Sequence, residues 1–277
     1  MAQSSKPPQK PVTVCIAGVT GEVGRLLTKA ILGEEDLLLT SAIARGAAGR
    51  TVGDVLDCAC DVEIRPSLAA AFAHDRFEVL VDYTSASAAF ENVQAALMAG
   101  VHVVVGSSGI TAEQFEGLDA LARSRTLGAV HGNFSITATL AQIFAAGAAR
   151  YLKSWEVIEY AHDDKIDAVS GTARELANRL ADSGPPEHRL AIDAFVGDSR
   201  SRGANVEGTQ VHAVRLPGMT FGFEIIFGRS HERLTIKHEA LSRAEPYIDG
   251  TILAIRNVPR LVGVHRGLES VLDLKPH

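Results

Sequence analysis

The 277-residue sequence contains only three cysteines, Cys15, Cys58 and Cys60. Three are too few for a disulfide framework, and they lack the Cys-x-x-Cys spacing of common metal and redox sites. We therefore expect reduced thiols and no bound metal.

Long apolar segments are also missing. No window approaches the roughly 18 uninterrupted apolar residues that a membrane-spanning helix needs. The first ten residues, MAQSSKPPQK, are polar and contain prolines, unlike the apolar stretch of a secretory signal. We expect residues 1–10 to form a disordered tail, and the protein to be cytoplasmic with no membrane partner.

Clustered positive charge is absent as well. The formal net charge is -6, and acidic and basic residues are mixed along the chain. A nucleic-acid binder presents a basic patch, so no nucleic-acid partner is expected. The 46% of hydrophobic and 22% of charged residues are typical of a globular protein, here long enough for two modest domains. A small molecule is the expected partner.

Short apolar runs alternate with segments of helical spacing in the first half of the chain. The runs lie at residues 12–17, 37–44, 79–83, 101–105 and 128–130. Strands that alternate with helices predict a parallel, doubly wound sheet with helices on both faces. We expect this α/β domain to extend over residues 11–134.

The pattern changes after Phe134, where a long helical stretch precedes a strand-like segment and a second helix. Three β-rich segments follow at short spacing, at residues 206–216, 221–228 and 232–241. They indicate a mixed or antiparallel sheet, and hence an α+β domain over residues 135–243. A final helical segment within residues 244–277 is expected to return to the first domain.

Glycines at positions 18, 21 and 24 follow the first predicted strand and open a predicted helix. This GxxGxxG pattern is a variant of the dinucleotide fingerprint, in which glycine permits a tight turn, approach to a pyrophosphate and close helix packing. We predict a Rossmann-type domain in which Gly18, Gly21, Glu22, Val23 and Gly24 bind the cofactor, with the Glu22 side chain pointing outward. The alternative is a glycine turn that serves packing alone.

The end of the second strand bears on the choice of cofactor. A carboxylate there would bind the ribose diol of NADH, whereas an arginine would bind the 2′-phosphate of NADPH. The segment reads Ala42-Ile43-Ala44-Arg45, without a carboxylate. We predict NADPH, with NADH as the second choice; a solvated loop arginine is the alternative for Arg45.

Two further loops follow predicted strands, Asp82-Tyr83-Thr84-Ser85 and Gly106-Ser107-Ser108-Gly109. Ligands bind at the carboxyl ends of the strands in parallel sheets. We predict that Tyr83, Thr84, Gly106 and Ser108 contact the cofactor, although ordinary strand-to-helix turns would have similar sequences.

The segment from Glu159 to Ala173 brings a histidine, a lysine and a Ser-Gly-Thr turn together ahead of a helix. Backbone amides at a helix start bind carboxylates, and Lys165 adds positive charge. The alternative is that Ser170 or Thr172 only caps the helix.

These motifs resemble the dihydrodipicolinate reductase family, also called 4-hydroxy-tetrahydrodipicolinate reductases. Its signature reads approximately E-x-H-H-x-x-K-x-D-A-P-S-G-T-A, and the resemblance extends to the GSSG loop, Asn133-Phe134-Ser135 and RGANVEGTQVHAVRLPG. The resemblance implies a Rossmann domain, a second domain for substrate binding and oligomerisation, and a homotetramer assembled through the second domain's sheet.

The resemblance also implies roles for individual residues. Lys165 and His162 correspond to catalytic positions. Substrate contacts are implied at Ser108, Ser170, Gly171 and Thr172, and cofactor contacts at Asn133 and Phe134.

Two positions depart from the family signature: Ala161 replaces the first histidine, usually proposed as the general acid, and Val169 replaces a proline. Reduction of a cyclic imine needs a proton as well as a hydride. Lys165, His162 or water would supply it, with Tyr160 as a further donor. We expect an NADPH-dependent reductase of a small carboxylate-bearing cyclic imine, of the dihydrodipicolinate type found in lysine and diaminopimelate biosynthesis. The alternatives are a paralogue that reduces another heterocyclic imine, or a catalytically weakened cofactor-binding protein.

Overall fold

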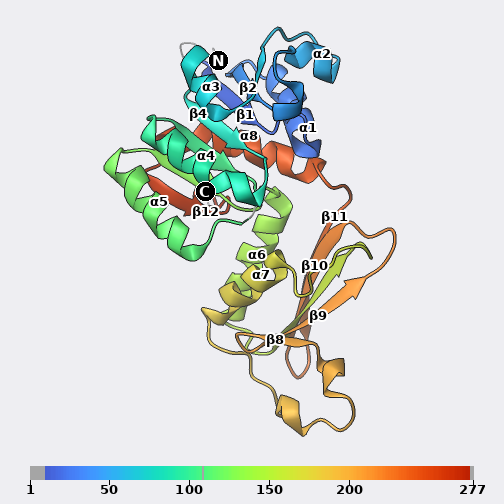
Figure 1. The fold of residues 1–277 in the computed structure, drawn as a ribbon. Helices are drawn as coiled ribbons and strands as arrows, with labels where there is room; N and C mark the ends of the chain where they lie inside the picture. The colour runs from blue at the N-terminus through green and yellow to red at the C-terminus, as the bar shows by residue number, and fades with distance from the viewer. Residues whose placement is uncertain (1–9, 108, 275–277) are drawn as a thin grey trace, which may run out of the picture. The chain divides into compact units, whose positions relative to one another are not determined.

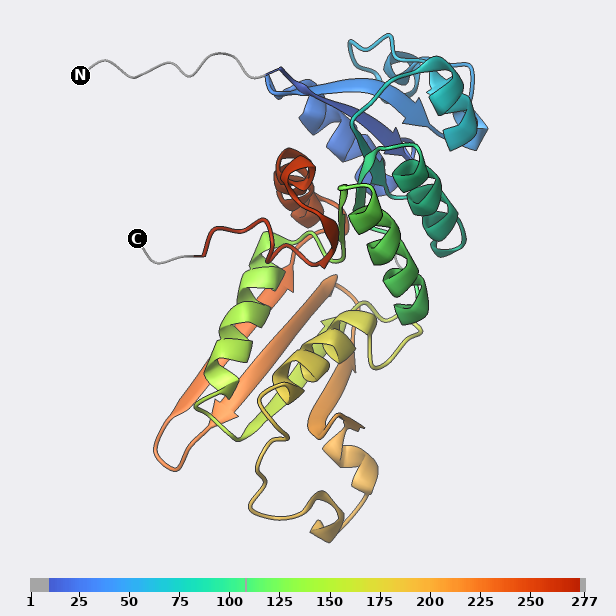
Figure 2. The same cartoon turned by 90° about the vertical axis from the view of Figure 1, so that its left-hand side faces the viewer.

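The computed structural model of the protein describes residues 10–107 and 109–274 (Figure 1; Figure 2 gives a second view). The expected tail, apart from Lys10, and Ser108 lie outside the described residues. The strands are β1 (Val12–Ala17), β2 (Leu37–Ile43), β3 (Ile64–Arg65), β4 (Val79–Asp82), β5 (His102–Val105), β6 (Gly128–His131), β7 (Trp155–Ala161), β8 (Ala204–Val206), β9 (Thr209–Arg215), β10 (Phe221–Gly228), β11 (Arg233–Ala240) and β12 (Gly263–Arg266). The helices are α1 (Glu22–Leu32), α2 (Val52–Leu56), α3 (Leu68–His74), α4 (Ala86–Met98), α5 (Ala112–Ser124), α6 (Ile136–Ala149), α7 (Gly171–Ala181) and α8 (Ile248–Asn257).

Contacts divide the chain into two compact units. The first contains the chain up to Ser135 together with the chain from Tyr247 onward, and the second is the continuous segment Ile136–Pro246. Helix α8 and strand β12 therefore belong to the first unit.

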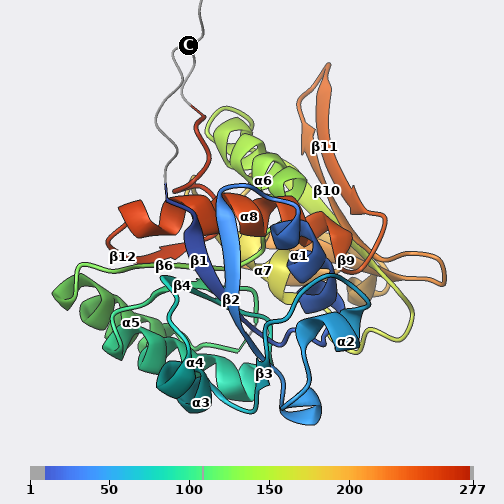
Figure 3. The same ribbon diagram turned by 90° about the horizontal axis from the view of Figure 1, so that it is seen from above.

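The first unit is built on a parallel sheet with the order β12-β6-β5-β4-β1-β2-β3. Helices α3, α4 and α5 lie along one face of this sheet, and α1 and α8 along the other (Figure 3). All four residues of β4 are buried, because a strand with helices on both faces has no side exposed to water. This arrangement confirms the predicted Rossmann-type sheet.

The second unit contains a five-stranded sheet with the order β11-β10-β7-β9-β8. The pair β7 and β9 is parallel, and the other neighbouring strands are antiparallel. The sheet is therefore mixed, which is one of the two forms that the sequence predicted. Helices α6 and α7 pack over one face of it (Figure 2). Burial along β7 alternates accordingly, with Trp155, Val157, Glu159 and Ala161 buried on the helix-covered face.

No helix in the described part of the chain has both the length and the apolar character to cross a membrane. No group of three or more His, Cys, Asp or Glu residues in that part could hold a metal ion.

Candidate functional site

The glycine turn between β1 and α1 is fixed by backbone packing. Gly18 has a positive φ of 89°, and a Cβ atom on Gly24 would lie 2.1 Å from the carbonyl oxygen of Gly18. Glycine at position 24 therefore lets the first turn of α1 rest directly on the loop. Gly21 is the N-cap residue, without a side-chain cap.

The start of α1 presents free hydrogen-bond donors. The amides of Glu22, Val23 and Gly24 belong to the first turn and have no acceptor inside the helix. The Glu22 side chain is exposed, as expected. A pyrophosphate suits this position, because the donors and the helix dipole both favour negative charge.

Arg45 follows β2 directly and is exposed in a short 3-10 helix, Arg45–Ala47. The preceding residue is held in place, since the amide of Ala44 donates to the carbonyl oxygen of Arg65 at 3.1 Å. Within the described ranges, the Arg45 guanidinium makes no hydrogen bond or ion pair, so it is available to a phosphate.

Asp82, at the end of β4, connects the two loops that the sequence singled out. Its buried carboxylate accepts hydrogen bonds from the Thr84 amide and hydroxyl, at 3.0 and 2.7 Å, and from the Ser107 hydroxyl at 2.8 Å. Asn92 of α4 donates a fourth, at 2.8 Å. The loops after β4 and β5 thus share one anchor, which the sequence analysis missed. An acidic residue closing an otherwise apolar strand is the signal that could have revealed it.

The Tyr83 side chain is directed into the first unit. Its hydroxyl bonds the hydroxyl of Thr251 on α8 at 2.7 Å, and its ring packs edge-to-face on Phe134. A Cβ atom on Gly106 would lie 2.0 Å from this ring, so the loop after β5 requires glycine there. Burial raises the pKa of Tyr83 well above its ordinary value.

The segment after β6 is anchored in the same unit. The side-chain oxygen of Asn133 accepts a hydrogen bond from the Ser135 amide at 2.8 Å, and Phe134 is buried. A Cβ atom on Gly250 of α8 would lie 2.0 Å from the Phe134 carbonyl oxygen. The Phe134 side chain is therefore a packing element of the first unit.

The motif turn, which we define as residues 162–170, joins β7 to α7. The Ser170 hydroxyl accepts a hydrogen bond from the Ala173 amide at 3.3 Å. Ser170 therefore caps the helix, as the alternative interpretation of this motif predicts. The amides of Gly171 and Thr172 belong to the first turn of α7 and have no acceptor within it. Capping thus leaves two donors for an anion.

The two candidate catalytic side chains lie on this turn, each beside a carboxylate. His162 is paired with Asp164, and the Lys165 ammonium lies 2.5 Å from an oxygen of Asp167. The hydrogen bond from Lys165 lowers the pKa of Asp167 below its usual range. The Lys165 amide also donates to the His162 carbonyl oxygen at 3.3 Å, which closes the turn.

A buried ion pair beneath the turn was not foreseen. Glu159, only 1% exposed, accepts a hydrogen bond from the Ser170 amide at 3.1 Å and another from the Arg215 guanidinium at 2.7 Å. Arg215 also donates to the Asp167 carbonyl oxygen at 2.6 Å. The signal in the sequence is a carboxylate in the alternating series of β7 where an apolar residue belongs.

Ala161 and Tyr160 lie on opposite faces of β7. Ala161 is 1% exposed and is paired with Arg215 on β9 and Phe221 on β10. The Tyr160 hydroxyl donates to Glu224 at 3.0 Å, and burial together with this bond raises the pKa of Tyr160 to about 12. Tyr160 is therefore a weak acid held away from Ala161.

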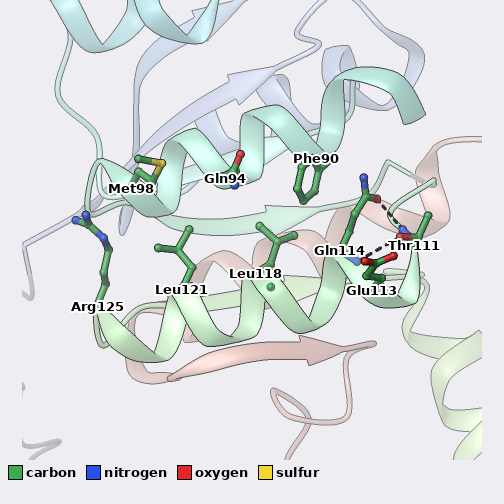
Figure 4. A pocket seen from close by; sticks show the side chains of 10 residues that line it. Phe90, Gln94, Met98, Thr111, Glu113, Gln114, Leu118, Leu121 and Arg125 are labelled. Carbon is green, nitrogen blue, oxygen red and sulfur yellow. Dashed lines mark hydrogen bonds between the residues drawn. The ribbon is translucent and has the colours of Figure 1, made fainter.

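A groove of about 650 Å³ lies between α4 and α5, outside these motifs. Phe90 and Met98 face Leu118 and Leu121 across it, with Gln94 between Phe90 and Met98 and Arg125 at one end (Figure 4). Such a lining does not suit a pyrophosphate or a dicarboxylate, and none of the predicted site residues contributes to it.

Comparison with known proteins covers both units. Residues 12–134 match the family model "Dihydrodipicolinate reductase, N-terminus", and residues 134–272 match "Dihydrodipicolinate reductase, C-terminus". The 4-hydroxy-tetrahydrodipicolinate reductase of Moorella thermoacetica is 39% identical over 271 residues, which are 95% of this chain and 98% of the relative. That of Listeria welshimeri is 34% identical over 262 residues, 94% and 99% of the two chains.

Solved structures agree with these matches. The dipicolinate-bound dihydrodipicolinate reductase from Paenisporosarcina sp. TG-14 superposes with a TM-score of 0.82 at 28% identity, over 95% of this chain and all of the other. GenD2 from gentamicin A biosynthesis, in complex with NAD, shares the fold at 15% identity and a TM-score of 0.63, over 93% and 89%. With both units matched in sequence and 95% of the chain matched in structure, this protein belongs to the dihydrodipicolinate reductase family.

Proposed function

We propose that this protein is an NADPH-dependent reductase of a dihydrodipicolinate-type substrate, a small cyclic imine bearing carboxylates, in lysine and diaminopimelate biosynthesis. The observation that carries this proposal is the motif turn, which places Lys165 and His162 on one loop directly before the free amides of α7. Family membership supplies the reaction class.

The substrate half of the proposal rests on α7. The amides of Gly171 and Thr172, with the Ser170 hydroxyl and the Lys165 ammonium, bind one carboxylate of the substrate. Ser108, outside the described residues, is assigned a further contact through the family resemblance alone.

The cofactor half rests on the first unit. The first turn of α1 binds the pyrophosphate, and Arg45 binds the 2′-phosphate, which favours NADPH over NADH. The loops of Tyr83, Thr84 and Gly106, and the backbone at Asn133 and Phe134, surround the nicotinamide. When bound, the reduced nicotinamide supplies a hydride.

The proton must come from a residue other than Ala161. Lys165 and His162 are the two candidates on the motif turn, and each lies beside a carboxylate. Either group would hold a proton near the ring while the amides of α7 fix the carboxylate.

Ala161 favours a second candidate function, the reduction of a different heterocyclic imine. A histidine at this position would occupy the buried face of β7, where alanine now packs. A smaller side chain there suits a substrate that needs no proton from that side.

We further propose a cytoplasmic homotetramer. The face of the second sheet opposite α6 and α7 carries the half-buried Ile158, Val214 and Ile226. Apolar side chains on a sheet face that no helix covers are typical of a subunit interface.

The test is an assay of NADPH oxidation with enzymatically generated dihydrodipicolinate-type substrate. Turnover that dipicolinate inhibits would support the proposal. Tight NADPH binding without turnover would refute it, and turnover restricted to another cyclic imine would favour the second candidate. The variant Ala161→His separates these cases: a gain in rate indicates a weakened ancestral site, and a loss indicates a site adapted to alanine.

A further inference from the structure

We infer that Glu159 and Arg215 are positioning residues, whose buried ion pair holds the motif turn so that the amides of α7 and the Lys165 ammonium converge on a substrate carboxylate. The inference rests on the proposed function and deepens it. Neither residue is assigned contact with the substrate.

Glu159 fixes the end of the turn. It lies on the helix-covered face of β7, and both of its carboxylate oxygens are 3.1 Å from the Ser170 amide nitrogen. Because Ser170 is the N-cap of α7, this bond sets where the helix begins and where the next two amides point. A buried carboxylate is costly without partners, so its place beneath the turn calls for a specific role.

Arg215 fixes the middle of the turn. Strand β9 runs parallel to β7, with Arg215 opposite Ala161. One nitrogen of the guanidinium donates to both Glu159, at 2.7 Å, and the Asp167 carbonyl oxygen, at 2.6 Å. Since the Asp167 side chain holds Lys165, the position of that ammonium depends on the same guanidinium.

The start of the turn is tied to the neighbouring strand. The Leu216 amide, one residue beyond Arg215, donates to the Ala161 carbonyl oxygen at 3.1 Å. The turn is therefore held at its beginning, its middle and its end, and the last two anchors depend on the Glu159 and Arg215 pair. Losing that pair would free the turn without removing any group that is expected to touch the substrate.

Electrostatics and positioning predict opposite results for the loss of Glu159. If the carboxylate acted only through its charge, its removal would strengthen dicarboxylate binding, because like charges repel. If it positions the turn, its removal weakens binding, because the α7 amides and Lys165 lose their alignment. The sign of the change in affinity therefore distinguishes the two roles.

The experiment measures dipicolinate binding to the full-length protein by titration calorimetry. Glu159→Gln is expected to raise the dissociation constant about 10- to 100-fold, the range expected for the loss of one hydrogen bond to a charged group. The control is Glu175→Gln, which removes an exposed carboxylate from α7 that pairs along the helix with Arg179. This control should bind as tightly as the wild type or slightly more tightly. Tighter binding by Glu159→Gln would overturn the inference.

A double variant guards against simple loss of folding. Glu159→Gln leaves the partly buried Arg215 charge without its partner, whereas Glu159→Gln with Arg215→Met removes both charges. We expect the double variant to melt closer to the wild type than the single variant does, yet to bind dipicolinate as weakly. Wild-type affinity in the double variant would contradict a positioning role.

Amide hydrogen exchange provides a readout that needs no ligand. Exchange in residues 162–172 should be faster in Glu159→Gln than in the wild type and unchanged in Glu175→Gln. Unchanged exchange in Glu159→Gln would overturn the inference. If the wild-type protein binds no dipicolinate, the proposed function fails, while the exchange measurement still decides whether Glu159 holds the turn.

Discussion

The Tyr83 hydroxyl donates its proton to the Thr251 hydroxyl oxygen, and the Thr251 hydroxyl in turn donates to the Tyr247 carbonyl oxygen, each at 2.7 Å. This chain of bonds joins the end of β4 to α8, across 168 residues of sequence. It places the C-terminal helix against the loop that we assign to the cofactor.

We predict that Tyr83→Phe lowers the free energy of unfolding by about 1 kcal/mol, the usual net contribution of one hydrogen bond. Urea denaturation would measure this change. Thr251→Val removes the same bond from the other side, so the two effects should be less than additive in the double variant. Full additivity would contradict a direct bond between the two hydroxyls.

Gly24→Ala is expected to destabilise the protein by roughly 1–3 kcal/mol and to weaken NADPH binding, because the new methyl group would displace the Gly18 backbone. Gly147→Ala is the matched control. Gly147 lies inside α6 with no atom within 4 Å of its would-be Cβ, so alanine should stabilise by about 0.5–1 kcal/mol. Melting shifts of the same sign in both variants would contradict this prediction.

Arg45→Ala should raise the dissociation constant for NADPH about 10- to 100-fold and leave that for NADH unchanged, since it removes a charge-assisted bond to the 2′-phosphate alone. Fluorescence titration with both cofactors would measure it. Arg50→Ala tests a nearby exposed arginine that bonds the Asp54 carbonyl oxygen, and we expect no change in cofactor preference. An equal loss of affinity for NADPH and NADH in Arg45→Ala would refute the assignment of Arg45 to the 2′-phosphate.

The stability of the protein should fall as the pH drops below about 6.5, partly through His238. This buried histidine bonds Thr137 at 3.2 Å, and burial lowers its pKa below the ordinary 6.5. Below that value the unfolded chain binds a proton more readily than the folded protein, so acid favours unfolding until the folded-state pKa is passed. Burial lowers the pKa of His102 and His131 in the same direction.

Urea denaturation at about pH 7.5 and about pH 5 would separate the His238 contribution. Between the higher and the lower pH, His238→Gln should lose less of its free energy of unfolding than the wild type. His231→Gln, at an exposed loop position, should behave like the wild type. An unchanged loss in His238→Gln would exclude this histidine as a source of the acid sensitivity.

Much of the first unit could be predicted because its strands are buried on both faces and form uninterrupted apolar runs, as in Val79–Asp82. Strand β12, with the sequence GVHR, was missed, since four residues carrying a histidine and an arginine have no recognisable strand pattern. A mixed sheet was one of the two predicted forms, but the sequence did not indicate that β7 and β9 are its parallel pair. Strand composition reveals where a strand lies, but not the direction of its neighbour.

In the candidate site, too, residues within one short motif could be predicted, whereas contacts between distant segments could not. Lys165, His162 and Ser170 could be predicted as candidate site residues because one contiguous motif carries them. Arg215 lies 56 residues from Glu159, and no spacing rule connects two such positions before the fold is known. Asp82 was read as the start of a loop, whereas its role comes from partners on two other segments, Asn92 and Ser107.

The way the chain is divided between its two units has a consequence for its synthesis. The second unit is one continuous segment, whereas the first needs α8 and β12, which are made after it. On a ribosome, the second unit can therefore complete its fold while the sheet of the first still lacks its edge strand. The first unit, although it contains β1, is therefore expected to finish folding last.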